Sequence, residues 1–303
     1  MSASRLIALF GPTGVGKTEV AVRLASLLRE RGERPVAISA DALQVYRGLE
    51  ILTGVASAGE RAALEHRLVS FLPLDASFSA GQYAELAHAE IDAALAEGRR
   101  PIVVGGTGLY LRAALTVLDL RPPPAEGVRE RLTAELQAHG PEALHARLAA
   151  SAPWAAAEID PNDRQRVVRA LELLQAGELE PPEGPNRLWT EEVRRPTLLV
   201  GLTMEREALY RRIDARVEAM LADGVAAEVR AAHAAGASQT ARKALGFEEL
   251  LRGDEEAMKR RTRNYARRQL TWMRKLAPPL QIDLSEHDAA QTAGLILGAL
   301  EHE

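Results

Sequence analysis

A glycine-rich octapeptide near the start of the chain constrains its fold more than any other feature. Residues 11–18 read Gly-Pro-Thr-Gly-Val-Gly-Lys-Thr. They directly follow an apolar run at residues 5–10 and open a segment, 17–30, whose apolar residues recur at helical spacing. An apolar run that ends at glycine predicts a buried strand, and the spacing after it predicts a helix. Gly-x-x-x-x-Gly-Lys-Thr between a strand and a helix is typical of a phosphate-binding loop, or P-loop.

The residue types in this loop explain how it would bind a polyphosphate. Glycines let successive backbone N–H groups point inward, and a helix N-terminus adds partial positive charge. Lys17 supplies a positive charge for phosphate oxygens, and the hydroxyl of Thr18 is a ligand for Mg²⁺. The alternative is a glycine-rich turn with a chance lysine. The motif does not distinguish a nucleotide such as ATP from a pyrophosphate ester, and the sequence has no Asn-Lys-x-Asp guanine-recognition motif.

Strand-like and helix-like segments alternate on both sides of a long helical stretch. Strands are expected at 36–40, 101–105 and 197–202, which with intervening helices predicts a parallel sheet covered on both faces. Between Arg121-Pro122-Pro123-Pro124 and the Pro/Gly/Glu-rich stretch at 180–186, the patterning is helical only, with helices expected at 128–137 and 164–176. A further helix is expected at 254–276. We therefore predict an α/β fold, a P-loop parallel-sheet core with an inserted helical domain. The expected parts are the core's first part at 1–120, the insertion at 121–196, and the core's return with a basic C-terminal helix at 197–303.

Composition excludes several classes of protein. Of the 303 residues, 47% are hydrophobic and 26% are charged, as in ordinary globular proteins. The absence of cysteine rules out disulfides, thiolate metal sites and cysteine nucleophiles. No apolar run approaches the ~18–20 residues that span a bilayer. The apolar stretch before Gly11 is too short for a secretory leader, so we expect a cytoplasmic protein.

Two further segments follow predicted strands and are candidates for the same site. Asp41 comes directly after the strand at 36–40. Because ligands of such sheets bind at the C-terminal strand ends, we expect Asp41 to face the P-loop from the neighbouring strand, the alternative being a helix N-cap. Residues 105–110, Gly-Gly-Thr-Gly-Leu-Tyr, predict a turn that a backbone or ligand approaches closely, with Thr107 at its mouth. A tight turn without a ligand is the alternative there.

Positive charge is concentrated in two predicted helices, although the net charge is −4. From Lys259 to Lys275 the sequence has eight basic residues and no acidic one. Self-repulsion in such a run favours a polyanionic partner over a solvated surface helix. A shorter patch, Arg164-Gln165-Arg166 with Arg169, suits phosphate and base-edge contacts, although an ordinary surface helix is the alternative. Around Arg216, nothing local separates phosphate binding from pairing within its helix.

Taken in order along nearly the whole chain, these segments resemble the tRNA dimethylallyltransferase family, also called tRNA isopentenyltransferases. The combination of Asp-Ala-Leu-Gln-Val-Tyr, Gly-Gly-Thr-Gly-Leu-Tyr and Arg-Gln-Leu-Thr-Trp is far more specific than the P-loop. The matching blocks are GPTGVGKT (11–18), SADALQVYRG (39–48), HRL (66–68) followed by FSAGQYAELA (78–87), PIVVGGTGLYLRA (101–113), DPNDRQRVVRALE (160–172), LGFEE (245–249) and RRQLTWMRK (267–275).

The resemblance implies a reaction and its partners. A dimethylallyl group would pass from dimethylallyl diphosphate to N6 of the adenosine at tRNA position 37, just 3′ of the anticodon, with release of diphosphate. The P-loop would then hold a diphosphate leaving group rather than ATP for hydrolysis, with Mg²⁺ as cofactor. The implied partners are the tRNA anticodon stem-loop and dimethylallyl diphosphate, with no membrane, and a monomer is expected.

The resemblance also implies roles for individual residues. Asp41 would be the general base, and Thr13, Lys17 and Arg216 would be the other catalytic residues, with Thr18 on the metal. The implied diphosphate-binding residues are Gly11, Pro12, Thr13, Gly14, Val15, Gly16, Lys17 and Thr18. The implied tRNA-contacting residues are Asp41, Ala42, Leu43, Gln44, Thr107, Arg129, Gln165, Arg166, Val167, Val168, Arg169, Arg242 and Phe247.

The sequence departs from the family pattern at three places. Where members commonly read Ile-Gly-Thr-Ala-Lys-Pro, residues 51–56 read Ile-Leu-Thr-Gly-Val-Ala and lack the lysine. Only His66 remains of a frequent histidine pair, and Phe247 replaces a usual tyrosine. Two rival hypotheses remain at this point: a small-molecule P-loop kinase, suggested by residues 11–18 alone, and a non-catalytic RNA-binding protein, suggested by residues 259–275.

Overall fold

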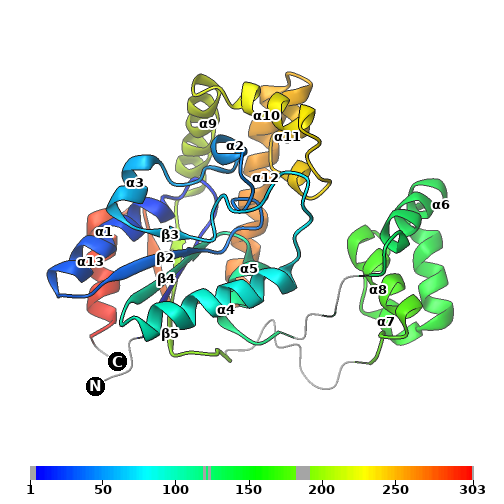
Figure 1. Ribbon diagram of the computed structural model, residues 1–303, viewed down its shortest axis with the longest axis horizontal. Coiled ribbons are helices and arrows are strands. Elements are labelled where there is room, and N and C mark those ends of the chain that lie inside the picture. The colour runs from blue at the N-terminus through cyan, green and yellow to red at the C-terminus, as the bar shows by residue number, and fades with distance from the viewer. Residues whose placement is uncertain (1–4, 119–120, 122–123, 182–191, 302–303) are drawn as a thin grey trace. The chain divides into compact units, whose positions relative to one another are not determined.

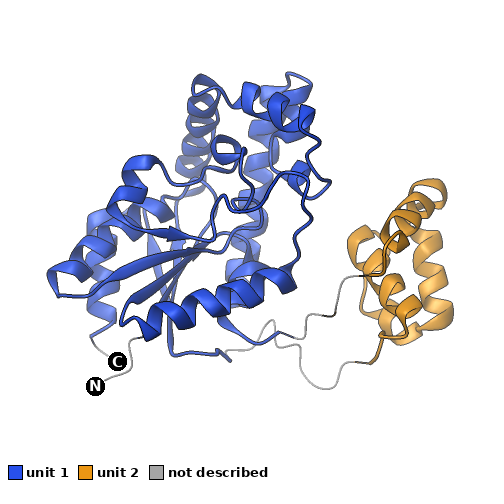
Figure 2. Ribbon diagram, viewed as in Figure 1, with its two compact units in different colours: residues 1–118, 191–303 blue, residues 119–190 orange. Residues whose placement is uncertain are grey.

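The computed structural model describes residues 5–118, 121, 124–181 and 192–301. The chain divides into two compact units, a core of residues 1–118 and 191–303 and a helical unit of residues 119–190 (Figure 2). The helical unit thus ends earlier than the predicted boundary at 196. Residues 192–196 belong with the core, where the Arg194 N–H donates to the Leu115 carbonyl at 2.7 Å. Pro122, Pro123 and the greater part of the predicted 180–186 stretch lie outside the described residues.

A parallel sheet forms the centre of the core (Figure 1). Its order is β3-β2-β4-β1-β5-β6, and every pair is parallel. β1 is entirely buried between two neighbours because its sequence, LIALF, has no polar residue to expose on either face. The strands are β1 Leu6–Phe10, β2 Pro35–Ser39, β3 His66–Arg67, β4 Arg100–Gly105, β5 Thr197–Thr203 and β6 Leu280–Asp283.

Helices cover both faces of this sheet. α1 and α13 pack against each other on one face, and α4 and α5 pack together on the other (Figure 1). None of the helices in the described ranges combines the length and apolar character that a bilayer crossing requires. The core helices are α1 Lys17–Glu30, α2 Glu50–Thr53, α3 Ala58–Ala63, α4 Ala80–Ala96, α5 Gly108–Leu115, α9 Arg206–Ala222, α10 Val225–Ala234, the 3₁₀ turn Ala241–Lys243, α11 Phe247–Leu251, α12 Glu255–Leu276 and α13 Ala289–Ala299.

The helical unit is built from α6 Val128–Ser151, α7 Pro153–Ala157 and α8 Arg164–Ala176. α6 continues well beyond the predicted 128–137, but it bends at Gly140, whose φ is 80°, directly before Pro141. α8 matches the predicted 164–176 and begins at Asp163, whose side chain accepts from the N–H of Arg166. The apolar faces of the three helices form a separate small core.

The order of the strands corrects one expectation. Asp41 follows β2, which was expected to lie beside the P-loop strand β1, but β4 lies between them. A crossover connection such as the one through α1 does not require consecutive strands to be neighbours, so a later strand can be inserted between them. The turn after β4 therefore lies between the P-loop and Asp41.

Candidate active site

Three loops leave the carboxyl edge of the sheet from neighbouring strands. The P-loop follows β1, the Gly105–Gly108 turn follows β4, and Asp41 follows β2. Gly105 lets the loop after β2 approach the end of β4, because a Cβ at this position would overlap the Ala40 carbonyl oxygen. The backbone bond from Ala40 N–H to Val104 O, at 2.8 Å, fixes the same approach. This edge is where ligands of open α/β sheets bind.

The P-loop has the backbone shape of an anion nest. Gly14 and Gly16 have φ values of 82° and 108°, which other residues rarely adopt, and Gly16 directly precedes α1. The N–H of Val15 donates to Pro12 O at 3.3 Å. Within the described part of the chain, the N–H groups of Gly14 and Gly16 donate to no protein acceptor. A nest with free donors at a helix N-terminus is suited to a phosphate group.

Lys17 lies across the loop that it belongs to. Its ammonium donates to the carbonyls of Gly11 and Pro12, at 2.9 and 3.0 Å. Burial, and after it the positive charge of Arg216, lower the pKa of Lys17 from 10.5 to about 8, against the opposing negative charge of Asp41. These couplings place Lys17, Arg216 and Asp41 in one electrostatic site, although they come from α1, α9 and the loop after β2.

Arg216 reaches this site from α9, which lies over the P-loop. A Cβ added at Gly14 would lie 3.0 Å from Ile213 Cγ1, and one at Gly16 would lie 3.4 Å from Arg212 Nη2. Burial lowers the pKa of Arg216, while Asp41 and then Glu60 raise it. Among the described residues, no hydrogen bond or ion pair satisfies its guanidinium. A half-buried cation without a protein partner beside a P-loop is suited to a phosphate oxygen.

Asp41 keeps one of its carboxylate oxygens available. Its Oδ1 accepts from the backbone N–H groups of Leu43, at 2.9 Å, and Gln44, at 3.3 Å. These two bonds hold the side chain in a turn at the start of the loop rather than at a helix N-cap. Within the described ranges, Oδ2 accepts no hydrogen bond. The carboxylate is therefore oriented by the backbone and has a free acceptor in the site.

The segment at residues 51–54, the end of α2 and its C-cap, is fixed from two sides and lies against the Arg216 side chain. Glu228 of α10 accepts from the N–H groups of Ile51 and Leu52 at 2.9 and 2.8 Å. Gln44 donates to the carbonyls of Thr53 and Gly54 at 3.3 and 3.1 Å. A Cβ at Gly54, whose φ is 62°, would overlap the Arg216 guanidinium. The amide of Gln44, a predicted tRNA contact, is thus engaged in holding this loop.

Side chains of α12 fill the second glycine cluster. Thr107 and Tyr265 share a hydrogen bond between their hydroxyls at 3.1 Å. A Cβ at Gly106 would overlap Gln269, and one at Gly108 would overlap Trp272. The close approach that the glycines predicted is therefore made by α12, and Thr107 contacts that helix as well as the mouth of the site. Sequence analysis missed Gln269, whose partners are 256 and 163 residues away.

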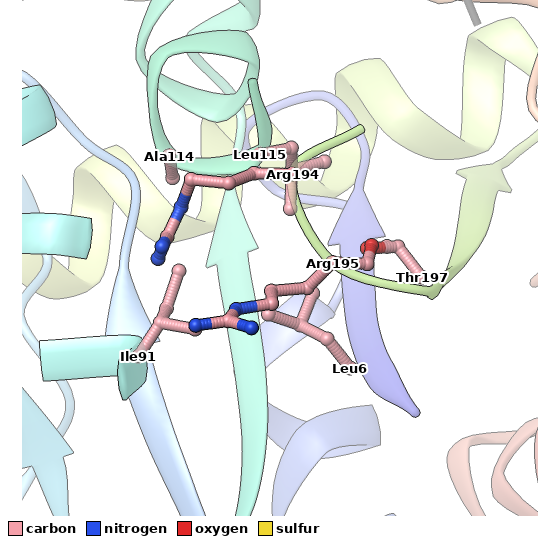
Figure 3. A pocket seen from close by; sticks show the side chains of 7 residues that line it. All are labelled: Leu6, Ile91, Ala114, Leu115, Arg194, Arg195 and Thr197. Atoms are coloured by element: carbon pink, nitrogen blue, oxygen red, sulfur yellow. The ribbon is translucent and has the colours of Figure 1, made fainter. Parts of the chain in front are cut away.

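A separate cavity at the opposite end of the strands is not part of this site. It is too small to hold even a water molecule, and Arg194 and Arg195 lie among its lining residues (Figure 3). Leu6 and Thr197, the first residues of β1 and β5, also line it. The P-loop follows the last residue of β1, so the two features lie at different edges of the sheet.

Comparison with known proteins agrees with this geometry. The model of the IPP transferase family matches residues 44–276. The tRNA dimethylallyltransferase of Anaeromyxobacter dehalogenans is 44% identical, over 91% of this chain and 95% of its own. That of Kineococcus radiotolerans is 42% identical, over 89% and 88%. The chain belongs to the IPP transferase family.

Solved structures of similar proteins have the same fold. The full-length tRNA isopentenylpyrophosphate transferase of Bacillus halodurans superposes with a TM-score of 0.69 at 34% identity, covering 98% of this chain and 97% of its own. A eukaryotic dimethylallyltransferase acting on tRNA gives a TM-score of 0.75 at 24% identity, covering 98% and 79%, and supports the fold alone. The α/β fold predicted for this IPP transferase is thereby confirmed.

Three side chains expected to contact tRNA are buried instead. Val167 and Val168 are 0% and 7% exposed in the core of the helical unit, and Phe247 is 0% exposed in the main core. Apolar side chains at these positions stabilise their own units and are not exposed on the surface, and the tRNA contacts expected at these residues stay a prediction. The neighbouring Arg242 stacks over the Phe247 ring, with its guanidinium carbon 5.6 Å from the centroid, and pairs with Glu248 at 2.8 Å.

Arginines of the helical unit have a structural partner. Glu172 is 1% exposed, and both of its oxygens accept from Arg129 at 2.6 and 2.7 Å, while Arg169 donates to it at 3.1 Å. Burial alone would raise the pKa of Glu172, but the bonds from Arg129 and Arg169 lower it overall. Gln165 and Arg166 remain exposed on α8. The predicted patch therefore combines an ion-pair network with exposed polar groups.

Part of the basic run on α12 is paired with carboxylates of neighbouring helices. Lys259 pairs with Glu218, Arg261 with Glu249 and Arg263 with Asp214, at 2.6 to 2.8 Å. The run has no acidic residue of its own, but α9 and α11 supply these carboxylates, so self-repulsion is a weaker argument for a polyanion than the sequence suggested. The cations that stay exposed are Arg260, Arg267, Arg268, Arg274 and Lys275.

Proposed function

We propose that this IPP transferase is a tRNA dimethylallyltransferase. It transfers a dimethylallyl group from dimethylallyl diphosphate to N6 of the adenosine at position 37 of tRNA, adjacent to the anticodon. One observation carries the proposal: two cations, Lys17 and Arg216, and the carboxylate of Asp41 influence one another at the mouth of a P-loop. The two cations suit a diphosphate leaving group, and a carboxylate with a free oxygen suits a nucleophile that gives up a proton.

The two ends of the site have separate chemical tasks. The lone pair of the adenosine N6 attacks C1 of the dimethylallyl group while the bond from C1 to the diphosphate oxygen breaks. The electron pair leaves with the diphosphate, whose growing charge is neutralised by the P-loop amides, Lys17 and Arg216. An exocyclic adenine amine is a poor nucleophile, and the free Oδ2 of Asp41 accepts its proton. The target base leaves its stack in the anticodon loop to enter the site.

Mg²⁺ is proposed as the metal, bound through Thr18. The residues fit this ion, because Thr18 is the second residue of α1 and its hydroxyl makes no hydrogen bond within the described ranges. Mg²⁺ is commonly held by one or two protein oxygens together with substrate phosphates. The described residues contain no cluster of three or more His, Asp or Glu side chains that could hold a metal ion. When bound, it supplies further neutralisation of the leaving group.

Transfer of labelled prenyl group tests the proposal. The protein is incubated with labelled dimethylallyl diphosphate, Mg²⁺ and an anticodon stem-loop carrying the adenosine, and the label should appear on the RNA. Asp41→Asn should lower kcat on the order of 10²–10⁴-fold with little change in the KM for dimethylallyl diphosphate. Asp223→Asn makes the same change at the exposed end of α9 and should keep full activity.

Two results would count against the assignment. Absence of label on every stem-loop and on bulk tRNA would reject prenyl transfer. Phosphate transfer from ATP to a small molecule without RNA would favour the kinase, and full activity of Asp41→Asn would remove its role as the base.

A further inference from the structure

We propose that Gln269 is a positioning residue that fixes the shape of the P-loop where the diphosphate binds. Its carboxamide joins the P-loop to the turn after β4, and α12 holds both in place through it. The inference rests on the proposed function, because it concerns the affinity of the P-loop for the diphosphate substrate.

The contacts of Gln269 are short and buried. Its side chain is on α12, and the residue is 4% exposed. Oε1 accepts from the backbone N–H of Thr13 at 2.8 Å, and Nε2 donates to the carbonyl of Gly106 at 2.8 Å. The donor and acceptor that it faces fix the orientation of the amide, since the reverse orientation would satisfy neither group. One side chain thus satisfies two backbone groups from different loops.

The turn after β4 is shaped to admit this side chain. A Cβ at Gly106 would overlap Gln269 Nε2 and lie 2.9 Å from Gly11 O, and one at Gly108 would overlap Trp272. Tyr265, Gln269 and Trp272 are spaced by four and three residues, so they lie on one face of α12. The glycines therefore serve the approach of this helix face, and Gln269 is the member that also reaches the P-loop.

The bond to Thr13 determines which P-loop amides face the ligand. The Thr13 N–H is directed to Gln269, while those of Gly14 and Gly16, just after it, have no protein acceptor in the described part of the chain. Without Gln269, the partly buried Thr13 N–H would lose its acceptor, and a rearrangement of the loop that directs this N–H to another acceptor would become favourable. Such a rearrangement would displace the backbone N–H groups of Gly14 and Gly16 that bind the diphosphate.

The test compares two replacements of similar size. Gln269→Met removes both hydrogen bonds, and Gln269→Glu keeps an acceptor for Thr13 but loses the donor for Gly106 whenever it is ionised. Thr271→Ala is a control on the exposed side of the same helix. KM for dimethylallyl diphosphate, KM for the stem-loop and the melting temperature are measured for each variant.

Gln269→Met should raise KM for dimethylallyl diphosphate roughly tenfold, the effect of a lost acceptor for one buried N–H, and leave KM for the stem-loop within about twofold. Gln269→Glu should show a similar rise at pH 7.5. It should recover toward the wild-type value near pH 5.5, because protonation restores the donor and burial favours the neutral carboxyl. Each value is divided by the wild-type value at the same pH, because the charged or titratable groups near this site, Lys17, Asp41 and Tyr265, are the same in both proteins.

Three results would overturn the inference: an unchanged KM for dimethylallyl diphosphate, an equal rise for both substrates, or no recovery of Gln269→Glu in acid. If Gln269→Met does not fold, the pH dependence of Gln269→Glu still decides. A wild-type protein that transfers no prenyl group would reject the proposed function instead, and the affinity for inorganic diphosphate, measured by calorimetry, would still report on Gln269.

Discussion

The pKa of Lys17 has a measurable consequence for binding. Burial and the charge of Arg216 bring it from 10.5 to about 8, with Asp41 opposing them, so much of the free protein carries a neutral Lys17 in mildly alkaline solution. A bound diphosphate supplies negative charge beside the ammonium and raises its pKa again. Binding above pH 8 therefore requires the uptake of a proton, and affinity should fall as the pH rises.

The size of the effect follows from proton linkage. If only the protonated form binds, the apparent Kd is multiplied by 1 + 10^(pH − pKa), a factor of about 1.1 at pH 7, about 2 at pH 8 and about 11 at pH 9. We therefore expect roughly tenfold weaker binding at pH 9 than at pH 7, or about 1.4 kcal/mol. Folding stability has the opposite sign: between pH 8 and 10.5 the unfolded chain holds more protons at this lysine, so its contribution to stability rises with pH.

Calorimetry without RNA isolates this step. Dimethylallyl diphosphate is titrated into the protein at pH 7, 8 and 9 with constant Mg²⁺, in two buffers of different ionisation enthalpy. At pH 8 the difference between buffers should correspond to the uptake of about half a proton for each ligand bound. Lys17→Arg keeps its charge at every pH and should show little dependence. Arg216→Gln removes one cause of the lowered pKa and should move the midpoint to higher pH.

The reasoning fails if the wild-type affinity is constant from pH 7 to pH 9, or if the heat at pH 8 does not depend on the buffer. Equal pH dependence in Lys17→Arg would assign the effect to another group.

Further predictions concern the Arg216 loop, the helical unit and α12. Gly54→Ala should raise KM for dimethylallyl diphosphate, because the new Cβ displaces the Arg216 guanidinium. The control is Gly32→Ala, which has a φ of 78° and open space around the new Cβ. Both variants should lose about 1 kcal/mol of stability in urea unfolding, but only Gly54→Ala should change KM. Glu172→Gln should lower the free energy of unfolding by about 2 kcal/mol. Because the pKa of Glu172 is lowered in the folded protein, the stability that its carboxylate contributes should be lost as the pH falls below 4.5 through the folded pKa. Urea unfolding midpoints of the wild type that do not change in this pH range would contradict the prediction. Arg260→Gln should reduce the slope of log affinity for the stem-loop against log salt by about one, and an unchanged slope would exclude a phosphate contact.

Local patterns predicted the elements that position the site. The apolar run before Gly11 and the periodic segment after it form β1 and α1, with α1 at Lys17–Glu30 as expected. Segments at 164–176 and 254–276 also appear within a residue of their predicted bounds. These succeed because a strand end, a glycine-rich loop and a helix start are encoded in adjacent residues. The location of Asp41 at a strand end was predictable for the same reason.

Features that depend on distant residues were not predictable. The insertion of β4 between β1 and β2 is a matter of topology, which spacing along the chain does not encode. Gln269 resembles any other polar residue in a basic helix until the fold brings Thr13 and Gly106 to it. In the same way, the carboxylates that neutralise Lys259, Arg261 and Arg263 are invisible within the run itself.

The departure from the family pattern at residues 51–56 acquires a physical meaning at Arg216. The lysine that family members commonly have there is absent, and in the structure this segment lies against Arg216. Glu228 and Gln44 fix its backbone through four hydrogen bonds, and Gly54 leaves the space that the Arg216 guanidinium occupies. Because that guanidinium has no protein partner in the described residues, its position depends on the shape of this loop. A change of sequence at 54 should therefore act on diphosphate affinity before it acts on RNA affinity.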